Sequence, residues 1–304
     1  MSPPRTPLGR TLAIINPFSA KGRARRAWPE ISATLRDAGL PFDEVTTHSP
    51  EEGMELAARA GGDGYAVVIS AGGDGTTHWA VNGLMRSRTS PVPALAIIPE
   101  GTANDFPRCL RIPLNPRAAA RTVLDGTRRR VDIGQVNDHY FATISGVGFD
   151  AEVAQLVNRW PRWIKGTTVY VAGILQTLVT YRPVDARITI DGQEQQLKLF
   201  LLAAANTNWY GGGMYMAPHA NIEDGLLAVV YATDLTKLET LAVLPKVFSG
   251  RHLTHPKVAH TTARDVRVDS VAPLAIHADG EIVGKVPAVF RIVPRAIEVV
   301  VPRA

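Results

Sequence analysis

The spacing of hydrophobic residues changes once along the chain, and this change indicates two parts with different folds. In about the first 125 residues, apolar runs of strand length alternate with longer segments that have helical spacing. The runs at Tyr65–Ser70 and Ala94–Pro99 are almost continuously apolar, which is typical of parallel strands covered on both faces. Two further strands are expected at Thr11–Pro17 and at residues 42–47. This part is therefore predicted to be an open, doubly wound α/β domain.

After Thr127–Arg130 the pattern changes to short strands in which apolar and polar residues alternate. The pair Asp191-Gly192 is a strong signal for a two-residue turn between two such strands. Residues 166–181 and 235–250 have helical spacing instead. We therefore predict a mainly antiparallel β-sandwich domain with inserted helices. The expected boundary gives domains of residues 1–128 and 129–304, and the last strand could return to the first domain.

The tetrapeptide Gly-Gly-Asp-Gly occurs twice, and the two copies lie at opposite ends of one predicted strand. Gly61–Gly64 precedes the strand Tyr65–Ser70, whereas Gly72–Gly75 follows it and begins a helix. Ligands of open α/β sheets bind beyond the carboxyl ends of the strands. We therefore interpret the first copy as a turn. The second copy is interpreted as a phosphate-binding loop, because glycine lets the backbone approach an anion at a helix start.

Polar residues follow two other strands of the first domain. Asn16, Ser19 and Lys21 follow the first strand, and the sequence "EGTANDF" at residues 100–106 follows Ala94–Pro99. Together with the second glycine motif, these strand ends predict a nucleotide site. The chain has neither a G-x-x-x-x-G-K-[ST] loop nor the set of protein-kinase motifs, so a kinase activity would belong to another class.

The composition limits the cellular compartments and the classes of partner that are expected for this protein. The chain has 304 residues and a net charge of +5, which is compatible with anionic partners such as nucleotides or acidic lipids. Cys109 is the single cysteine, so no disulfide can form within the chain and a reducing compartment is favoured. The sequence has no signal-peptide pattern and no run of about 18 apolar residues. We therefore expect a cytoplasmic protein without a membrane span.

Five motifs, in this order, resemble the diacylglycerol-kinase catalytic-domain family, which includes bacterial lipid kinases and is related to sphingosine and ceramide kinases. The motifs are "INP" at 15–17, "GGDGTTHWAVNGL" at 72–84, "IIPEGTANDFPRCL" at 97–110, "NWYGGGMYMAPHANIEDGLLAVV" at 208–230 and "HADGEIVG" at 277–284. NAD kinases and 6-phosphofructokinases carry loops similar to "GGDGT", so the other motifs point to the lipid kinases. The resemblance covers essentially the whole chain.

The resemblance implies a kinase that transfers the γ-phosphate of ATP to a lipid hydroxyl, with a role in phospholipid biosynthesis. It implies that the α/β domain is like that of NAD kinases and phosphofructokinases, and that ATP binds between this domain and the β-sandwich. The family commonly has Asn-Glu where this chain has His78-Trp79, so no side-chain role is carried over there. The implied ATP-binding residues are Asn16, Thr46 or Thr47, Gly72, Gly73, Asp74, Gly75, Thr76, Thr77, Gly101, Thr102, Asn104 and Asp105.

Asp224-Gly225 is a turn signal in the second domain, and the resemblance gives it a further role. It implies that Mg²⁺ binds the carboxylate of Asp224 and the main-chain oxygens of Asn221 and Leu226. A hard cation of this kind prefers oxygen ligands. The cofactors implied by the resemblance are therefore ATP and Mg²⁺.

The motif "HADGEIVG" contains the expected catalytic residues, Asp279 and Glu281. Residues two positions apart in an extended chain point the same way, and neighbouring carboxylates raise one another's pKa, which suits a general base. By resemblance, one of the two removes the proton from the lipid hydroxyl, and the sequence leaves the choice between them open. Asp74 is a third candidate, as an orienting or basic group.

The expected partner is a membrane lipid, reached by reversible, peripheral contact with the membrane. The segment "NRWPRWIKG" (Asn158–Gly166) mixes tryptophan with basic residues, which suits a membrane interface, although a partly buried loop with a solvated basic face explains it equally well. The acceptor stays open among diacylglycerol, a sphingoid base, ceramide, a polyprenol and phosphatidylglycerol. No nucleic-acid partner is predicted, and a homodimer stays open. The rival functions are a kinase of a soluble metabolite such as NAD, and a non-catalytic nucleotide- or lipid-binding protein.

Overall fold

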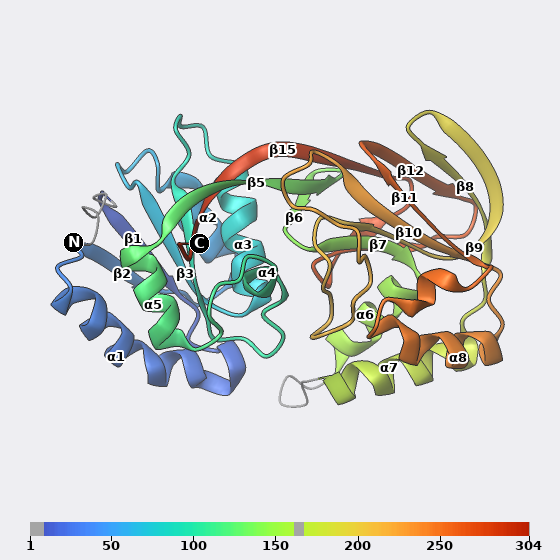
Figure 1. The fold of residues 1–304 in the computed structure, drawn as a ribbon, viewed down its shortest axis with the longest axis horizontal. Helices are drawn as coiled ribbons and strands as arrows, with labels where there is room; N and C mark the ends of the chain where they lie inside the picture. Colours follow the sequence, from blue (N-terminus) through green and yellow to red (C-terminus); the bar gives the residue numbers. More distant parts are fainter. Residues whose placement is uncertain (1–8, 161–166, 304) are drawn as a thin grey trace. The chain divides into compact units, whose positions relative to one another are not determined.

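The computed structural model describes residues 9–160 and 167–303, which fold as two units (Figure 1). The first unit contains the chain up to Val131 and the segment from Arg295 onward, and the second contains Asp132–Pro294. Two strands, β5 (Thr127–Val136) and β15 (Ala288–Val301), have residues in both units. Residues 161–166, which belong to the segment singled out for its tryptophans and basic residues, lie outside the described part.

The first unit is a parallel sheet with helices on both faces, which confirms the predicted α/β fold (Figure 1). The strand order is β2-β1-β3-β4, and the end of β15 pairs with β4, also in parallel. Because β3 and β4 are buried along their whole length, their sequences are apolar almost throughout. The strand bounds are β1 Thr11–Ile15, β2 Phe42–Thr46, β3 Val67–Gly72 and β4 Ala94–Pro99.

The helices of the first unit begin with local signals that the sequence carries. The Ser49 side chain accepts a hydrogen bond from the amide of Glu52, and Asn115 accepts two from the next helix, each followed by proline at the first helical position. α1 and α5 share one hydrophobic core with the sheet. The bounds are η1 Ser19–Gly22, α1 Arg23–Asp37, α2 Pro50–Arg59, α3 Asp74–Met85, α4 Asp105–Cys109 and α5 Pro116–Asp125.

The second unit is built on antiparallel strand pairs, as predicted. The strand order is β14-β13-β7-β9-β8-β12-β15, while β10 pairs with both β9 and β11, and β6 pairs with β5. The other bounds are β6 His139–Phe141, β7 Ile144–Gly148, β8 Val184–Ile190, β9 Gln193–Ala205, β10 Leu227–Thr233, β11 Val258–Ala263, β12 Asp265–Ser270, β13 Ala275–Ala278 and β14 Glu281–Lys285.

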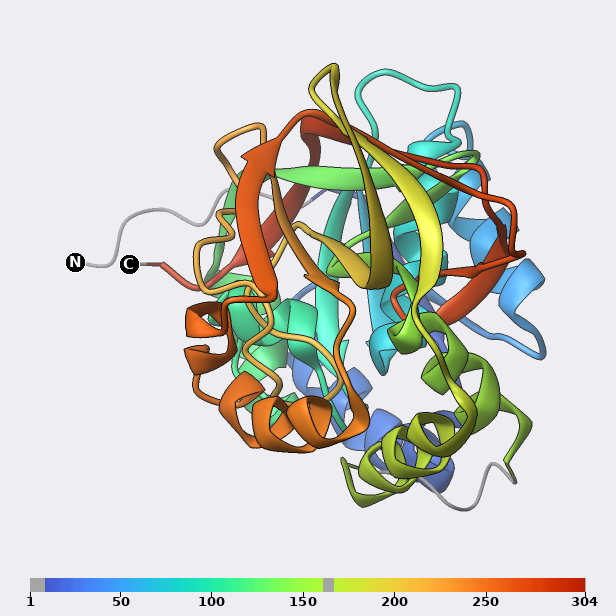
Figure 2. The ribbon, with the colours of Figure 1, turned by 90° about the vertical axis from the view of Figure 1, so that its right-hand side faces the viewer.

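Strand β10 separates two hydrophobic cores of this unit, because successive side chains of a strand point to opposite faces. Leu227 and Val229 belong to the core between the strands, whereas Ala228 and Val230 belong to a second core. The helices of the unit gather at one side of its strands (Figure 2). They are α6 Phe149–Arg159, α7 Thr167–Thr180, α8 Lys237–Val247 and the short η2 Arg251–Thr254. Within the described residues, no helix combines the length and the apolar character needed to cross a bilayer.

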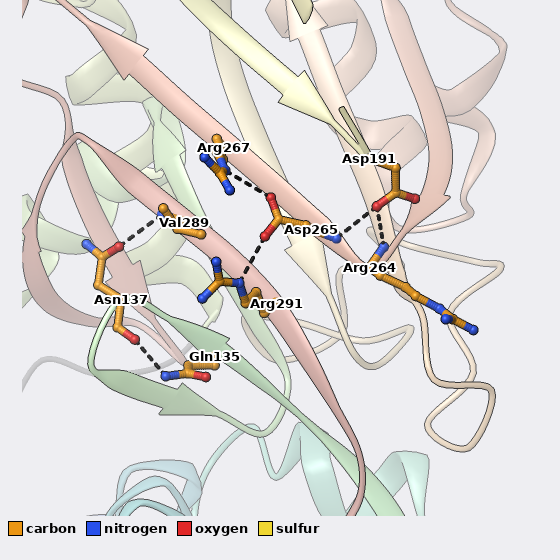
Figure 3. A network of polar contacts seen from close by, with 8 residues as sticks. All are labelled: Gln135, Asn137, Asp191, Arg264, Asp265, Arg267, Val289 and Arg291. Carbon is orange, nitrogen blue, oxygen red and sulfur yellow. Dashed lines mark hydrogen bonds and ion pairs between the residues drawn. The ribbon is translucent and has the colours of Figure 1, made fainter. Parts of the chain in front are cut away.

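The predicted turn at Asp191-Gly192 joins β8 to β9, and both of its residues have positive φ. This backbone conformation explains the Asp-Gly sequence, because both residue types tolerate it. The Asp191 carboxylate also accepts hydrogen bonds from the amides of Arg264 and Asp265, each at 2.9 Å. Figure 3 shows this contact beside the ion pairs of Asp265 with Arg267 and Arg291. The turn is thereby attached to the start of β12.

Candidate functional site

The residues implied in ATP binding lie at neighbouring strand ends of the first unit. In the parallel sheet, Ile15 is level with both Thr46 and Ala71, and Gly72 is level with Pro99. The segments that follow β1, β2, β3 and β4 therefore leave the sheet next to one another. Thr46 and Gly72 are the last residues of β2 and β3, and the segments that follow the strands hold the rest of the implied set: Asn16, Thr47, Gly73, Asp74, Gly75, Thr76, Thr77, Gly101, Thr102, Asn104 and Asp105.

Two of these side chains connect the segments to one another. The amide group of Asn16 donates a hydrogen bond of 3.0 Å to the hydroxyl of Thr76. Thr47 is buried, and its hydroxyl donates to the main-chain oxygen of Ile15 at 3.1 Å. Thr102, in contrast, is exposed. The buried threonines therefore shape the loops, while Thr102 is accessible to a ligand.

The glycines of the second Gly-Gly-Asp-Gly copy are required by close packing within the protein. A Cβ atom at Gly72 would lie 2.2 Å from the Thr76 hydroxyl oxygen, and one at Gly73 would lie 3.0 Å from Cα of Gly101. The first copy lies in the turn between α2 and β3, as predicted, and Gly64 there has a φ of +82°. The second copy is therefore the one in which two loops approach each other at main-chain distance.

Asp74 holds the two loops together through its carboxylate. Its oxygens accept hydrogen bonds from the amides of Asn104, at 2.7 Å, and Asp105, at 2.8 Å. An anion at this position satisfies the first amides of α4 and interacts favourably with the start of that helix. Asn104 itself has a φ of 52° and bonds both the amide and the carbonyl of Gly101. Asp74 and Asn104 thus fix the shape of residues 101–105.

An ion pair next to these loops was missed by the sequence analysis. Glu100 is 1% exposed, and its carboxylate accepts a hydrogen bond of 3.0 Å from Arg23. Arg23 also donates to the main-chain oxygen of Gly101. A sequence signal was present, because Glu100 directly follows an apolar strand whose residues are all buried. The partner could not be read from the sequence, since it lies 77 residues away.

The loop geometry of the first unit suits an anionic group. The first amides of a helix have no partner within that helix, and the helix dipole favours negative charge at this end. Thr77 is the first residue of α3 whose amide donates a hydrogen bond to a preceding main-chain oxygen, that of Gly73, at 3.0 Å. The start of α3 and the exposed Thr102 can therefore contribute to a phosphate site.

In the second unit, Asp279 lies in the turn between β13 and β14. Its carboxylate accepts hydrogen bonds from the amides of Ala142, Thr143 and Ile144 and from the hydroxyl of Thr143, at 2.6–3.3 Å. These four contacts attach the turn to the start of β7. Asp279 therefore has a structural role, whatever part it takes in catalysis.

The expectation that Asp279 and Glu281 lie in an extended chain is wrong. Asp279 and Gly280 both have positive φ, at 51° and 89°, and they form a two-residue turn. Glu281 is the first residue of β14 and is exposed. The alternation rule for strands does not apply across such a turn, so it gives no reason for the two carboxylates to point the same way.

At the Asp224 turn, the carboxylates of Asp224 and Glu223 are both exposed, and the buried carboxylate of Asp132 accepts a hydrogen bond of 2.7 Å from the Gly225 amide. One oxygen of Asp224 accepts a hydrogen bond from the Leu226 amide at 2.9 Å, and the side chain of Asn221 bonds the Glu223 amide. Across the described residues, no group of three or more His, Cys, Asp or Glu side chains is placed to hold a metal ion. The oxygen donors of this turn match a hard cation such as Mg²⁺, which would take main-chain oxygens and water as its other ligands.

The second unit also contains an apolar cavity that the sequence analysis did not identify. It has a volume of about 80 Å³ and lies between α6, α7, β9, β10 and α8. Of the described residues that line it, four are polar, namely Asp150, Tyr210, Thr240 and His252, and the others are apolar. The apolar lining includes Phe149, Val153, Ile174, Phe200, Val243 and Val247.

Burial changes the ionisation of two side chains near this cavity. The imidazole of His252 bonds the main-chain oxygen of Met216, and burial lowers the pKa of His252. The hydroxyl of Tyr181 donates to the main-chain oxygen of Phe200 at 2.8 Å, and burial raises the pKa of Tyr181. Both groups therefore favour their neutral forms, which is consistent with an apolar environment.

Two family models match the chain. The model of the diacylglycerol kinase catalytic domain matches residues 10–136, and that of the YegS C-terminal NAD kinase beta sandwich-like domain matches residues 143–301. A diacylglycerol kinase of Mycobacterium tuberculosis is 33% identical over 98% of this chain and 97% of its own length. A diacylglycerol kinase of Staphylococcus aureus is 31% identical over 96% of this chain and 92% of its own.

Solved structures from Bacillus anthracis share the fold. One has a TM-score of 0.84 at 22% identity and covers 99% of this chain and 98% of its own. A second, of a diacylglycerol kinase, has a TM-score of 0.73 at 20% identity and covers 96% of this chain and 97% of its own. These structures support the combination of an α/β domain and a β-sandwich-like domain.

Proposed function

Because the chain belongs to the diacylglycerol kinase catalytic-domain family, we propose that it is an ATP-dependent lipid kinase that transfers the γ-phosphate of ATP to a lipid hydroxyl. The family membership supports phosphoryl transfer to a lipid. The start of α3 and the exposed Thr102 in the first unit support a phosphate site. The apolar cavity of the second unit is the observation that carries the choice of a lipid as acceptor.

The cavity fits an acyl chain better than a soluble metabolite. Its volume is about 80 Å³, and most of the side chains that line it are apolar. Each methylene group that it buries contributes about 0.8 kcal/mol. A nucleotide such as NAD would instead leave polar groups without partners against the side chains of Phe149, Val153 and Ile174. The lining therefore favours the lipid over the soluble-metabolite rival.

In this proposal the chain's own residues divide the work of phosphoryl transfer. The main-chain amides at the start of α3 and the loop of residues 101–105 hold the phosphates of ATP. Asp279 or Glu281 accepts the proton that the lipid hydroxyl loses when it attacks the γ-phosphorus. Mg²⁺, when bound, supplies neutralising charge to the phosphate oxygens, and the Asp224 turn would hold such a cation.

We propose that α7 and α8 make the peripheral contact with the membrane. Four apolar side chains on these helices are exposed: Leu175, Val179, Leu238 and Leu241. The two helices are adjacent, because the ammonium group of Lys237 donates to the main-chain oxygen of Val179 at 2.5 Å. Apolar groups flanked by a cation suit a bilayer that contains anionic lipids, and such binding weakens with added salt.

The proposed function is tested with [γ-³²P]ATP, a whole lipid extract and a matched pair of variants on α8. Val243 lines the cavity and Ala242 is exposed on the same helix. Val243→Trp is expected to fill the cavity and abolish labelling of lipid while ATP still binds. Ala242→Trp adds the same side chain outside the cavity and is expected to keep the activity. Label that appears in NAD or another soluble metabolite, and not in lipid, would instead support the metabolite-kinase alternative.

A further inference from the structure

A carboxylate and an imidazole form a buried pair in the second unit, and neither belongs to the residues discussed above as catalytic. Asp150 Oδ2 lies 3.0 Å from Nε2 of His277, and the His277 side chain is fully buried. Asp150 is 8% exposed, and its other oxygen accepts a hydrogen bond from the Ala151 amide. The two residues are 127 positions apart in the sequence, and the pairing of β13 with β7 brings them together.

The second nitrogen of His277 fixes the proton position on the ring. The amide of Gly280 donates a hydrogen bond of 3.3 Å to Nδ1 of His277. An amide can only donate, so Nδ1 is the unprotonated nitrogen and the ring hydrogen is on Nε2. Nε2–H then donates to the Asp150 carboxylate, which is a charge-assisted hydrogen bond. The imidazole therefore connects Asp150 to the turn formed by Asp279 and Gly280.

The surrounding chain leaves little freedom for this connection. A Cβ atom at Gly146 would lie 2.3 Å from Asp150 Oδ2 and 3.1 Å from Nε2 of His277, so only glycine fits beside the pair. The ring of Tyr210 stacks on the imidazole with centroids 5.4 Å apart. The Ser145 hydroxyl donates to the main-chain oxygen of His277 at 2.5 Å. Tyr210 thus packs on the face of the ring, Gly146 leaves no free space at its edge, and Ser145 fixes the backbone of His277.

The two ends of the pair touch two different parts of the proposed lipid site. Asp150 lines the apolar cavity, and His277 bonds the turn that carries Asp279 and precedes Glu281. We propose that Asp150 and His277 form a positioning pair, which fixes the Asp279-Gly280 turn relative to the wall of the lipid cavity. This inference rests on the proposed function, since it concerns the alignment of an acceptor lipid with the candidate bases. His277 takes no proton from the substrate and acts through the turn.

Two substitutions of His277 separate its two contacts. In His277→Asn the side-chain oxygen stands near the position of Nδ1, so it can still accept from Gly280 but cannot reach Asp150. In His277→Gln the side-chain amide can still donate to Asp150, but no acceptor remains at the position of Nδ1. Misplacement of about 1 Å can cost roughly 100-fold in rate. We expect His277→Gln to lower kcat by about 10- to 100-fold and His277→Asn to lower it less, with the lipid KM little changed in both.

Val229→Ala serves as the control for lost stability. Val229 is fully buried in the core between the strands and lines neither the cavity nor the turn. This variant is expected to lower the unfolding temperature and to keep kcat. A role of His277 in stability alone would make the kcat of each variant follow its unfolding temperature. The positioning role predicts instead that kcat follows the contact between residue 277 and Gly280.

The Gly280 amide gives a readout that does not depend on turnover. In an ¹⁵N-correlated NMR spectrum of the full chain, its resonance is expected to move in His277→Gln and to stay near its wild-type position in His277→Asn. Addition of dioctanoylglycerol is expected to shift the same resonance in the wild type. In Asp150→Ala the lipid is expected to bind without that shift, and Asp150→Asn, which keeps an acceptor for Nε2–H, restores it.

The outcomes separate this inference from the proposed function. If the wild-type protein labels no lipid, the proposed function fails, while the NMR measurements still test the pair. Equal losses of kcat in His277→Gln and His277→Asn would overturn the inference. An unchanged Gly280 resonance in His277→Gln would overturn it as well, even in an active lipid kinase.

Discussion

A single methyl group at Gly73 should separate the two loops that we propose to hold ATP. The backbone of Gly73 has φ −96° and ψ −169°, a conformation that alanine adopts without strain. The new Cβ would lie 3.0 Å from Cα of Gly101 and 3.4 Å from the hydroxyl oxygen of Ser19. Carbon atoms in contact prefer about 3.5–4.0 Å, so the loops have to move apart by about 0.5–1 Å.

The cost of this crowding sets the expected loss of ATP affinity. Extra atoms in a packed region cost about 1–3 kcal/mol. In the free protein the loops can relieve the contact by separating, and ATP must bring them back to hold its phosphates. If the full cost then appears in binding, the Kd for ATP rises roughly 5- to 150-fold, because 1.4 kcal/mol corresponds to a factor of ten.

The first copy of the same tetrapeptide provides the control. A Cβ atom at Gly62 would lie 3.3 Å from the main-chain oxygen of Arg59 and 3.9 Å from a methyl group of Thr89, so it fits with a small adjustment. Isothermal titration calorimetry with a non-hydrolysable ATP analogue and Mg²⁺ compares Gly73→Ala with Gly62→Ala, and circular dichroism reports the unfolding temperature of both. Equal affinities in the two folded variants would refute the assignment of the second copy as the nucleotide loop.

Three other changes test separate parts of the structure. Asp191→Ala removes the acceptor of two amides at a position with positive φ (Figure 3). Urea unfolding should therefore show that the free energy of unfolding falls by about 1–2 kcal/mol, and Asp191→Asn should restore most of it. Burial lowers the pKa of folded His252 below that of the unfolded chain, so the unfolded state binds more protons as the pH falls below about 6.5. The unfolding temperature should therefore decrease with falling pH more steeply in the wild type than in His252→Gln; equal slopes would contradict this. Asp224→Ala should raise the Mg²⁺ concentration needed for half-maximal activity while Glu223→Ala does not, and an unchanged requirement would remove Asp224 from the cation site.

The parts of the fold that depend on local pattern could be predicted from the sequence. The strand Ala94–Pro99 was expected at its observed bounds, because a strand buried on both faces is apolar throughout. The turn at Asp191-Gly192 was expected because few dipeptides tolerate two residues with positive φ. Asp279-Gly280 carries the same turn signal. The extended chain expected there, from the two-residue spacing of Asp279 and Glu281, was wrong.

The contacts that build the candidate site could not be predicted from the local sequence pattern. Arg23 and Glu100 are 77 residues apart, and Asp150 and His277 are 127 apart. Each pair depends on which strands become neighbours, and hydrophobic spacing does not encode that order. The apolar cavity is formed by helices and strands from several parts of residues 149–258, so the sequence of any single segment does not predict it.

The Asp-Gly turns of the second unit show why an acidic residue in a motif does not by itself identify a catalytic base. The carboxylates of Asp191 and Asp279 both bind amides of a distant strand, and that of Asp224 binds an amide two residues ahead. Replacing Asp279 removes a carboxylate and at the same time releases the turn from β7, so a loss of activity there has two explanations. Glu281 is exposed at the start of β14, and Glu281→Gln leaves these contacts in place. A large fall in kcat in Glu281→Gln would therefore assign the base to Glu281, whereas full activity would leave Asp279 and Asp74 as the candidates for the group that accepts the proton.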